Sequence, residues 1–93
     1  MTAAGVDDDD SSMAADAMQA AYFRGTLADE RELIAAHAQK HRDEVARRIA
    51  AGMMSGIPHL RSQVRSHEAE LRYLDGLIAK LDRRFAALWA ARD

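Results

Sequence analysis

The sequence contains no cysteine, which excludes disulfides, thiolate metal sites and cysteine nucleophiles. It has no apolar run near the roughly 18 to 20 residues that a membrane-spanning helix requires. The N-terminus lacks a basic region followed by an apolar stretch, so no secretory signal peptide is recognised. These absences predict a protein that does not cross a membrane and that lies in the cytoplasm.

The chain of 93 residues suffices for one small domain. Apolar residues make up 48% and charged residues 30%, a balance that favours a folded chain over a disordered one. The net charge of −2 is unevenly spread, because residues 1–32 carry eight acidic and two basic side chains whereas residues 33–72 carry four and seven. Four consecutive aspartates, Asp7 to Asp10, repel one another, so residues 1–10 are predicted to form a disordered acidic tail.

Two helices are predicted before the only proline. The first covers residues 13–24, begins after a capping serine and stops at Gly25. The second covers residues 27–51, and Thr26 directly before it is the start signal. One continuous helix with a kink is the alternative, since a single glycine costs a helix only about 1 kcal/mol. The second helix carries an apolar stripe of Leu27, Ile34, Ala38, His41, Val45 and Ile49.

The third helix, predicted over residues 58–91, has the most regular apolar pattern in the sequence. Its seam residues alternate spacings of four and three, which keeps one side of a helix facing a neighbouring helix. Before it, Gly52 or Gly56 provides a left-handed helix cap, and Pro58 suits a first helical turn. The seam consists of Leu60, Val64, His67, Leu71, Leu74, Ile78, Leu81, Phe85 and Leu88.

A short turn between the second and third helices favours antiparallel packing. With the turn centred near residue 56, the numbers of two residues that face each other across the hairpin sum to about 112. This places Leu27 against Phe85 and Phe23 near Trp89. The predicted fold is therefore all-α: a coiled-coil-like antiparallel hairpin with a short N-terminal helix, forming a single domain over residues 11–93. Oligomerisation into a bundle is expected to complete it.

A two-helix seam buries too little apolar area to balance the entropy of ordering the chain. Tyr73 and Leu77 also lie off the seam, on a side of the helix that the hairpin contact leaves exposed to solvent. Methionines are unusual in a surface turn, and flexible thioethers suit adaptable protein contacts. A second interface is thus predicted, either between copies of the chain in a homo-oligomer, with a dimer favoured, or between the chain and a larger protein. It comprises Phe23, Tyr73, Leu77, Trp89, Met53 and Met54.

The sequence contains two further candidate sites. His37, His41 and Glu44 share one helix face at a spacing that can anchor a metal, but Ala38 occupies the position where a zinc protease motif places glutamate. A cluster of basic residues near the turn suits phosphate contacts, although acidic residues are interleaved with it. For the histidine group, the alternative is a polar flank of an amphipathic helix, with His41 and His67 half-buried in the seam. For the basic cluster, the alternative is a solvated charged surface. The basic residues are Arg42, Arg47, Arg48, Arg61 and Arg65.

Nothing in the sequence selects a catalytic group. The serines and histidines have no spacing that points to a triad, and no glycine-rich phosphate loop follows a strand. The seam is leucine, isoleucine and valine, where a di-iron bundle would carry carboxylates. The sequence predicts a non-catalytic association module without a cofactor, acting as a small subunit or adaptor. The alternatives are a small DNA-associated regulator and a metal-binding bundle. No motif identifies a family.

Overall fold

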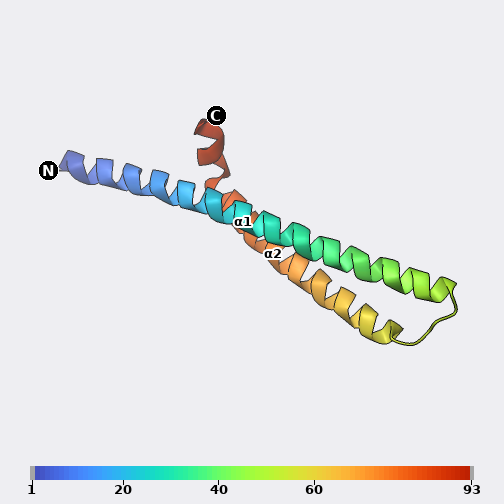
Figure 1. Cartoon of the computed structure of the whole chain (residues 1–93). Coiled ribbons are helices and arrows are strands. Elements are labelled where there is room, and N and C mark those ends of the chain that lie inside the picture. The colour runs from blue at the N-terminus through green and yellow to red at the C-terminus, as the bar shows by residue number, and fades with distance from the viewer. Residues whose placement is uncertain (1, 93) are drawn as a thin grey trace.

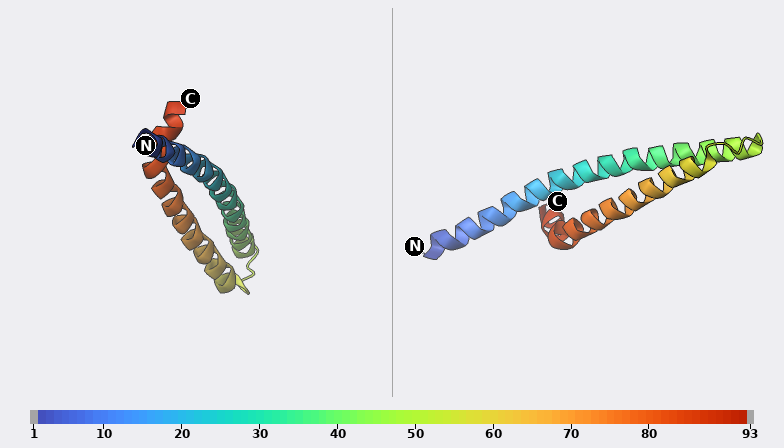
Figure 2. Two further views of the ribbon diagram at one scale, coloured as in Figure 1. Left: turned by 90° about the vertical axis from the view of Figure 1, so that its left-hand side faces the viewer. Right: turned by 90° about the horizontal axis from the view of Figure 1, so that it is seen from below.

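The protein is a helical hairpin, described here from a computed structural model (Figure 1). The structure describes residues 2–92, with side chains over residues 12–91. Helix α1 runs over Thr2–Ala50 and helix α2 over Ile57–Arg92, and the two lie antiparallel (Figures 1 and 2). No strand occurs among the described residues. The predicted all-α hairpin is confirmed.

The N-terminal half is one helix where two were predicted. Gly25 does not end a helix: the positive-φ residues of the described chain are Gly52 and Gly56, and Gly25 is not among them. The Thr26 hydroxyl donates to the carbonyl of Tyr22, 3.3 Å away, which is the bond of a threonine inside a helix and not of a cap. The helix thus continues through Gly25 despite the modest free-energy cost of one glycine, as the alternative of a continuous helix predicted. The side chains of residues 1–11 lie outside the described part, and the acidic tail stays a prediction.

Replacing Gly25 with alanine is expected to raise the free energy of unfolding by about 1 kcal/mol. The residue is exposed within a helix, and a Cβ added there meets nothing within 4 Å. Urea unfolding followed by circular dichroism measures the change. A loss of stability would contradict the continuous helix, because a glycine that ends a helix needs a conformation that alanine adopts poorly.

The turn begins with a glycine-capped helix end. The amide of Gly52 donates to the Ile49 carbonyl at 3.0 Å and the amide of Met53 to the Arg48 carbonyl at 2.8 Å, which is the Schellman pattern. Gly52 has φ 72° and Gly56 has φ 80°, so both predicted glycines adopt the left-handed conformation. The turn therefore spans residues 51–56, and its centre lies between Met53 and Met54.

Six of the nine described residues that are buried form two small clusters along the hairpin. In the first, Ala17 and Ala20 of α1 pack on Phe85 of α2, and in the second, Leu27 and Ile34 pack on Leu74. None of the predicted α2 seam residues is exposed, which confirms that stripe. On α1, Ile49 is an exception, because 45% of its surface is exposed. The described residues that are buried and apolar are Ala17, Ala20, Leu27, Ile34, Ala38, Ile57, Val64, Leu74 and Phe85.

The pairing register differs from the predicted one by about six residues. Phe85 lies against Ala17 and Ala20, not against Leu27, and Trp89 reaches Ala17 instead of Phe23. The prediction centred the turn near residue 56, but the helix cap at Gly52 starts the turn earlier. Helix ends at residues 50 and 57 give a sum of 107 for paired positions, in place of 112.

Among the described residues, two bidentate ion pairs join the helices in this observed register. Arg24 donates to Asp82 at 2.6 and 3.1 Å, and Arg31 binds Asp75 through both carboxylate oxygens. The residue numbers of each pair sum to 106. These hydrogen bonds lower the pKa of Asp75 and of Asp82, because the guanidinium groups stabilise the ionised carboxylates. The pairs reinforce the register, but they are solvent-exposed and add little to stability.

The two carboxylates make the hairpin weakly sensitive to acid. Their lowered pKa values mean that the unfolded chain, whose aspartates titrate near a pKa of about 3.9, binds protons before the folded chain does. The stability that the pairs supply is therefore complete above about pH 5 and is lost as the pH falls through the folded pKa values. We expect the urea midpoint to decline between pH 5 and 3, and the Asp75→Asn/Asp82→Asn variant to decline less. An equal decline in both proteins would contradict this role.

Candidate functional site

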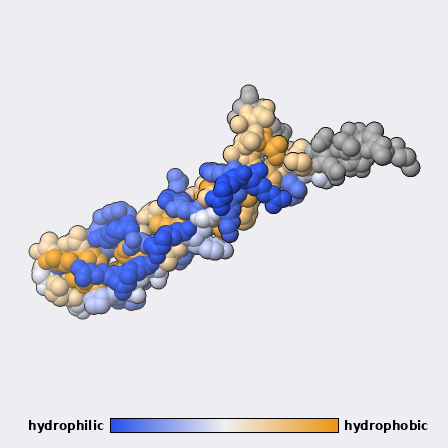
Figure 3. Space-filling model, turned by 180° about the vertical axis from the view of Figure 1, so that it is seen from behind, coloured by the Kyte–Doolittle hydropathy of each residue, from blue (hydrophilic) through white to orange (hydrophobic). Residues whose placement is uncertain are grey.

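The surface of the hairpin is unusual in the large apolar side chains that it leaves exposed. Single exposed hydrophobic residues are normal in a soluble protein, but adjacent ones mark interaction surfaces. Here they occur on both helices and at the turn, and Figure 3 shows apolar surface on several parts of one face. Among the described residues they are Met13, Met18, Tyr22, Phe23, Leu33, Ile49, Met53, Met54 and Tyr73.

Four of the six residues predicted for the second interface are exposed. Phe23 is 51% and Tyr73 68% exposed, and both turn methionines, Met53 and Met54, are more than half exposed. The four do not form one patch, because Met53 and Met54 lie at the turn and Phe23 lies on α1 more than twenty residues before it. Their accessibility suits a partner contact, which stays a prediction.

The other two interface residues are half-buried inside the hairpin. Leu77 packs beside the cluster of Leu27, Ile34 and Leu74. The indole nitrogen of Trp89 donates to the carbonyl of Ala17 at 2.9 Å, and its ring stacks on Phe85 at 5.9 Å between centroids. The contacts of both side chains within the chain limit what they can offer to a partner.

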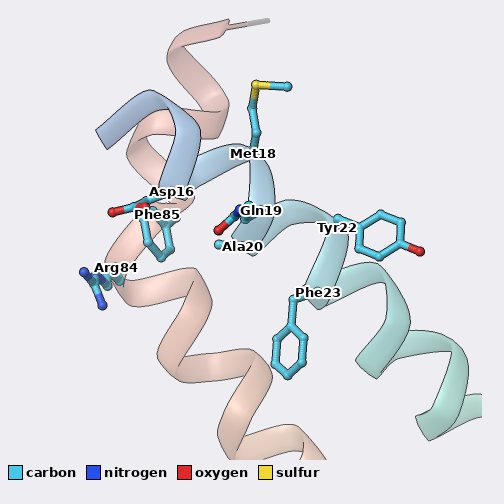
Figure 4. A pocket seen from close by; sticks show the side chains of 8 residues that line it. All are labelled: Asp16, Met18, Gln19, Ala20, Tyr22, Phe23, Arg84 and Phe85. Atoms are coloured by element: carbon cyan, nitrogen blue, oxygen red, sulfur yellow. The ribbon is translucent and has the colours of Figure 1, made fainter. Parts of the chain in front are cut away.

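An open pocket of about 840 Å³ lies between α1 and the C-terminal part of α2. Figure 4 shows Phe23 on its α2 side, whereas the ring of Tyr22 points away from α2. Sequence reasoning missed Met18 and Tyr22, which border this pocket. Their signal was present: they lie one turn apart, away from the stripe that packs on α2. Nothing in the lining suggests chemistry, as Asp16 and Arg84 supply its only charges.

Three histidines meet across the hairpin. The rings of His41 and His67 stack with 5.4 Å between centroids and 7° between planes, and the His37 ring lies 6.0 Å from that of His67. The Nδ1 atoms of His41 and His67 are buried and have no hydrogen-bond partner. Glu44, the third residue of the hypothesised metal site, is engaged elsewhere. Within the described part of the chain, no three histidine, aspartate or glutamate side chains are arranged to hold a metal ion.

Glu44 organises two of the arginines near the turn. Arg47 donates to it at 2.6 to 2.9 Å and Arg48 at 2.8 Å, and these hydrogen bonds lower the pKa of Glu44. Arg48 also donates to the carbonyl of Ser55 at 2.8 Å, so it braces the turn. These contacts neutralise part of the predicted basic surface.

The remaining arginines of that surface lie together. Arg42, Arg61 and Arg65 line an open pocket of about 270 Å³ with Val45, Val64 and Glu68. Arg42 comes within 3.9 Å of Glu68. An acid thus stands among the bases here as well, and the pocket shows no feature that is specific for a nucleic acid.

The comparisons with known proteins identify no relative. No protein-family model, curated protein or solved structure matches the chain. Neither helix, over its described residues, is both long and apolar enough to span a membrane.

Proposed function

We propose that the protein is a non-catalytic association module, a helical hairpin that completes its packing against another protein surface. It would act as a helical-bundle oligomer, or as a small subunit or adaptor of a larger assembly. The observation that carries the proposal is the contrast between the exposed and the buried residues. Large apolar side chains are exposed on both helices and the turn. Of the nine described residues that are buried and apolar, three are alanines: Ala17, Ala20 and Ala38.

The small core explains why a partner is needed. Alanine buries little apolar area, so the contacts between α1 and α2 stabilise the hairpin only modestly. Two packed helices also leave most of each helix surface in water, and bundles of four helices are the common way to cover it. Association would bury side chains such as Phe23 and Tyr73, which are 51% and 68% exposed.

Thermal unfolding at several protein concentrations tests the proposal. When folding is coupled to self-association, mass action makes the melting temperature rise with concentration. We expect the midpoint, followed by circular dichroism, to fall by several degrees on a hundredfold dilution. A monomer with weak helicity would also fit, and it would assign the missing surface to a different protein.

One result would contradict the proposal. A fully helical monomer that unfolds cooperatively at the same temperature across the whole concentration range would need no partner. The exposed apolar residues would then be ordinary surface residues.

A further inference from the structure

The side of α1 that faces away from α2 carries its own apolar residues. We define the back stripe as Met18, Tyr22, Leu33 and Ala36, all of which are exposed. At 100° per residue, each of them lies about 140° to 160° around the helix from Ala38, whose surface is fully buried against α2. The hairpin therefore leaves this stripe uncovered.

The charges beside the back stripe differ before Leu33 and after Ala36. Before Leu33, Arg24 and Arg31 are turned toward α2 by Asp82 and Asp75. The stretch before Leu33 carries exposed acids beside the stripe, and the stretch after Ala36 carries exposed bases beside it. The acids are Asp29 and Glu32, and the bases are Lys40 and Arg47.

Two acidic residues also stand after Ala36. Asp43 accepts a hydrogen bond from Gln39 at 2.8 Å, and Glu44 pairs with Arg47 at 2.6 Å. The outward face of α1 is thus acidic before Leu33. After Ala36 its charges balance, and Lys40 is an exposed base that forms no ion pair among the described residues.

We propose that a second copy of this chain packs its α1 antiparallel on the back stripe, about a twofold axis midway between Leu33 and Ala36. In this arrangement, a residue of one copy faces a residue of the other when their numbers sum to 69, as those of Leu33 and Ala36 do. Asp29 of each copy meets Lys40 of the other. This inference rests on the proposed function, since it names the partner and the surface of the association.

The orientation follows from the charges. A parallel pair would place each Asp29 beside its own counterpart and each Lys40 likewise, and like charges repel. An antiparallel pair makes both contacts attractive and sets the exposed ring of Tyr22 opposite Arg47, whose guanidinium is paired with Glu44 of its own helix. Gly25, on the same side of α1, has no atom within 4 Å of an added Cβ and adds no bulk to the contact.

Charge reversal tests the pairing. We expect Asp29→Lys to weaken self-association about tenfold, because it turns two symmetry-related attractions into repulsions. Lys40→Asp should do the same, and the double variant should restore the original affinity. Glu70→Lys, at an exposed acid of α2, is the matched control and should leave the affinity unchanged. Sedimentation equilibrium provides the dissociation constants.

Distances between spin labels test the orientation. The chain has no cysteine, so one label can be placed at Gln39→Cys or at Ala46→Cys. With a rise of 1.5 Å per residue, the antiparallel register separates the two copies along the axis by about 14 Å at position 39 and about 35 Å at position 46. Equal, short distances at both positions would mean a parallel pair and would overturn the inference.

The remaining outcomes separate this inference from the proposed function. An oligomer whose affinity ignores both charge reversals overturns the back-stripe pairing but keeps the association module. A weakly helical monomer also overturns the pairing and leaves a different protein as the partner. A fully helical monomer with a concentration-independent melting temperature overturns both.

Discussion

Replacing Ile34 with alanine is expected to lower the free energy of unfolding by about 2 to 4 kcal/mol. Ile34 is 7% exposed and packs with Leu27 and Leu74 in the central cluster of the hairpin. The substitution removes buried methyl and methylene groups and leaves a cavity that two rigid helices close only in part. Urea unfolding monitored by circular dichroism at one fixed protein concentration measures the change.

The matched control is Ile49→Ala on the same helix. Ile49 is 45% exposed, so the same change in side chain should cost less than about 1 kcal/mol. Alanine has the higher helix propensity at both positions, and this gain cancels when the two variants are compared. Equal losses at both positions would contradict the observed placement of the core, since the sequence pattern alone assigned both isoleucines to the seam.

A second large effect is expected when Ala38 is replaced by glutamate. Ala38 is fully buried between the helices, and no polar or charged residue among the described side chains is buried with it. A carboxylate there must either stay unpaired in the interface, at a cost of about 3 to 5 kcal/mol, or force the helices apart. We expect Ala38→Glu to abolish the cooperative unfolding transition at neutral pH and to reduce the far-ultraviolet helical signal.

The control for this variant is Ala46→Glu, at an exposed position of α1. Glutamate and alanine are both good helix formers, so α1 itself should tolerate either change. The control should fold like the parent protein. A cooperatively folded Ala38→Glu variant would show that α1 and α2 do not pack closely at this position.

The α2 seam was predictable because large apolar residues repeat along it without interruption. Leu74 and Phe85 carry a strong signal, and both are buried. By contrast, Ala17 and Ala20 are also buried, yet the sequence did not mark them as core. Alanine is common on both surfaces and interiors of helices, so only its neighbour in the fold, here Phe85, reveals its place.

The register and the helix boundaries depended on the glycines. Gly25 and Gly52 look alike in sequence, but the first lies inside a helix and the second ends one. What distinguishes them is the hydrogen bonding around Gly52, where the amide of Met53 returns to the Arg48 carbonyl. The numbers of two facing residues sum to twice the number at the turn centre. An error of about three residues in the turn centre therefore moved the predicted register by about six residues.

The candidate surface was only partly predictable. Phe23 and Tyr73 were expected to be accessible and they are, but Trp89 was not expected to donate to the backbone of α1. That bond depends on the register, which places Trp89 beside Ala17. The spacing of the hypothesised metal set did not reveal that Glu44 turns toward Arg47 and Arg48 on its own helix.

Light scattering of the purified chain over a dilution series tests the association most directly, because it gives the absolute mass. We expect a mass near twice the 10.3 kDa of the single chain at high concentration, falling toward 10.3 kDa as the sample is diluted. A constant 10.3 kDa, from a chain whose helicity is complete at every concentration, would contradict the central claim that this hairpin finishes its packing on a protein surface.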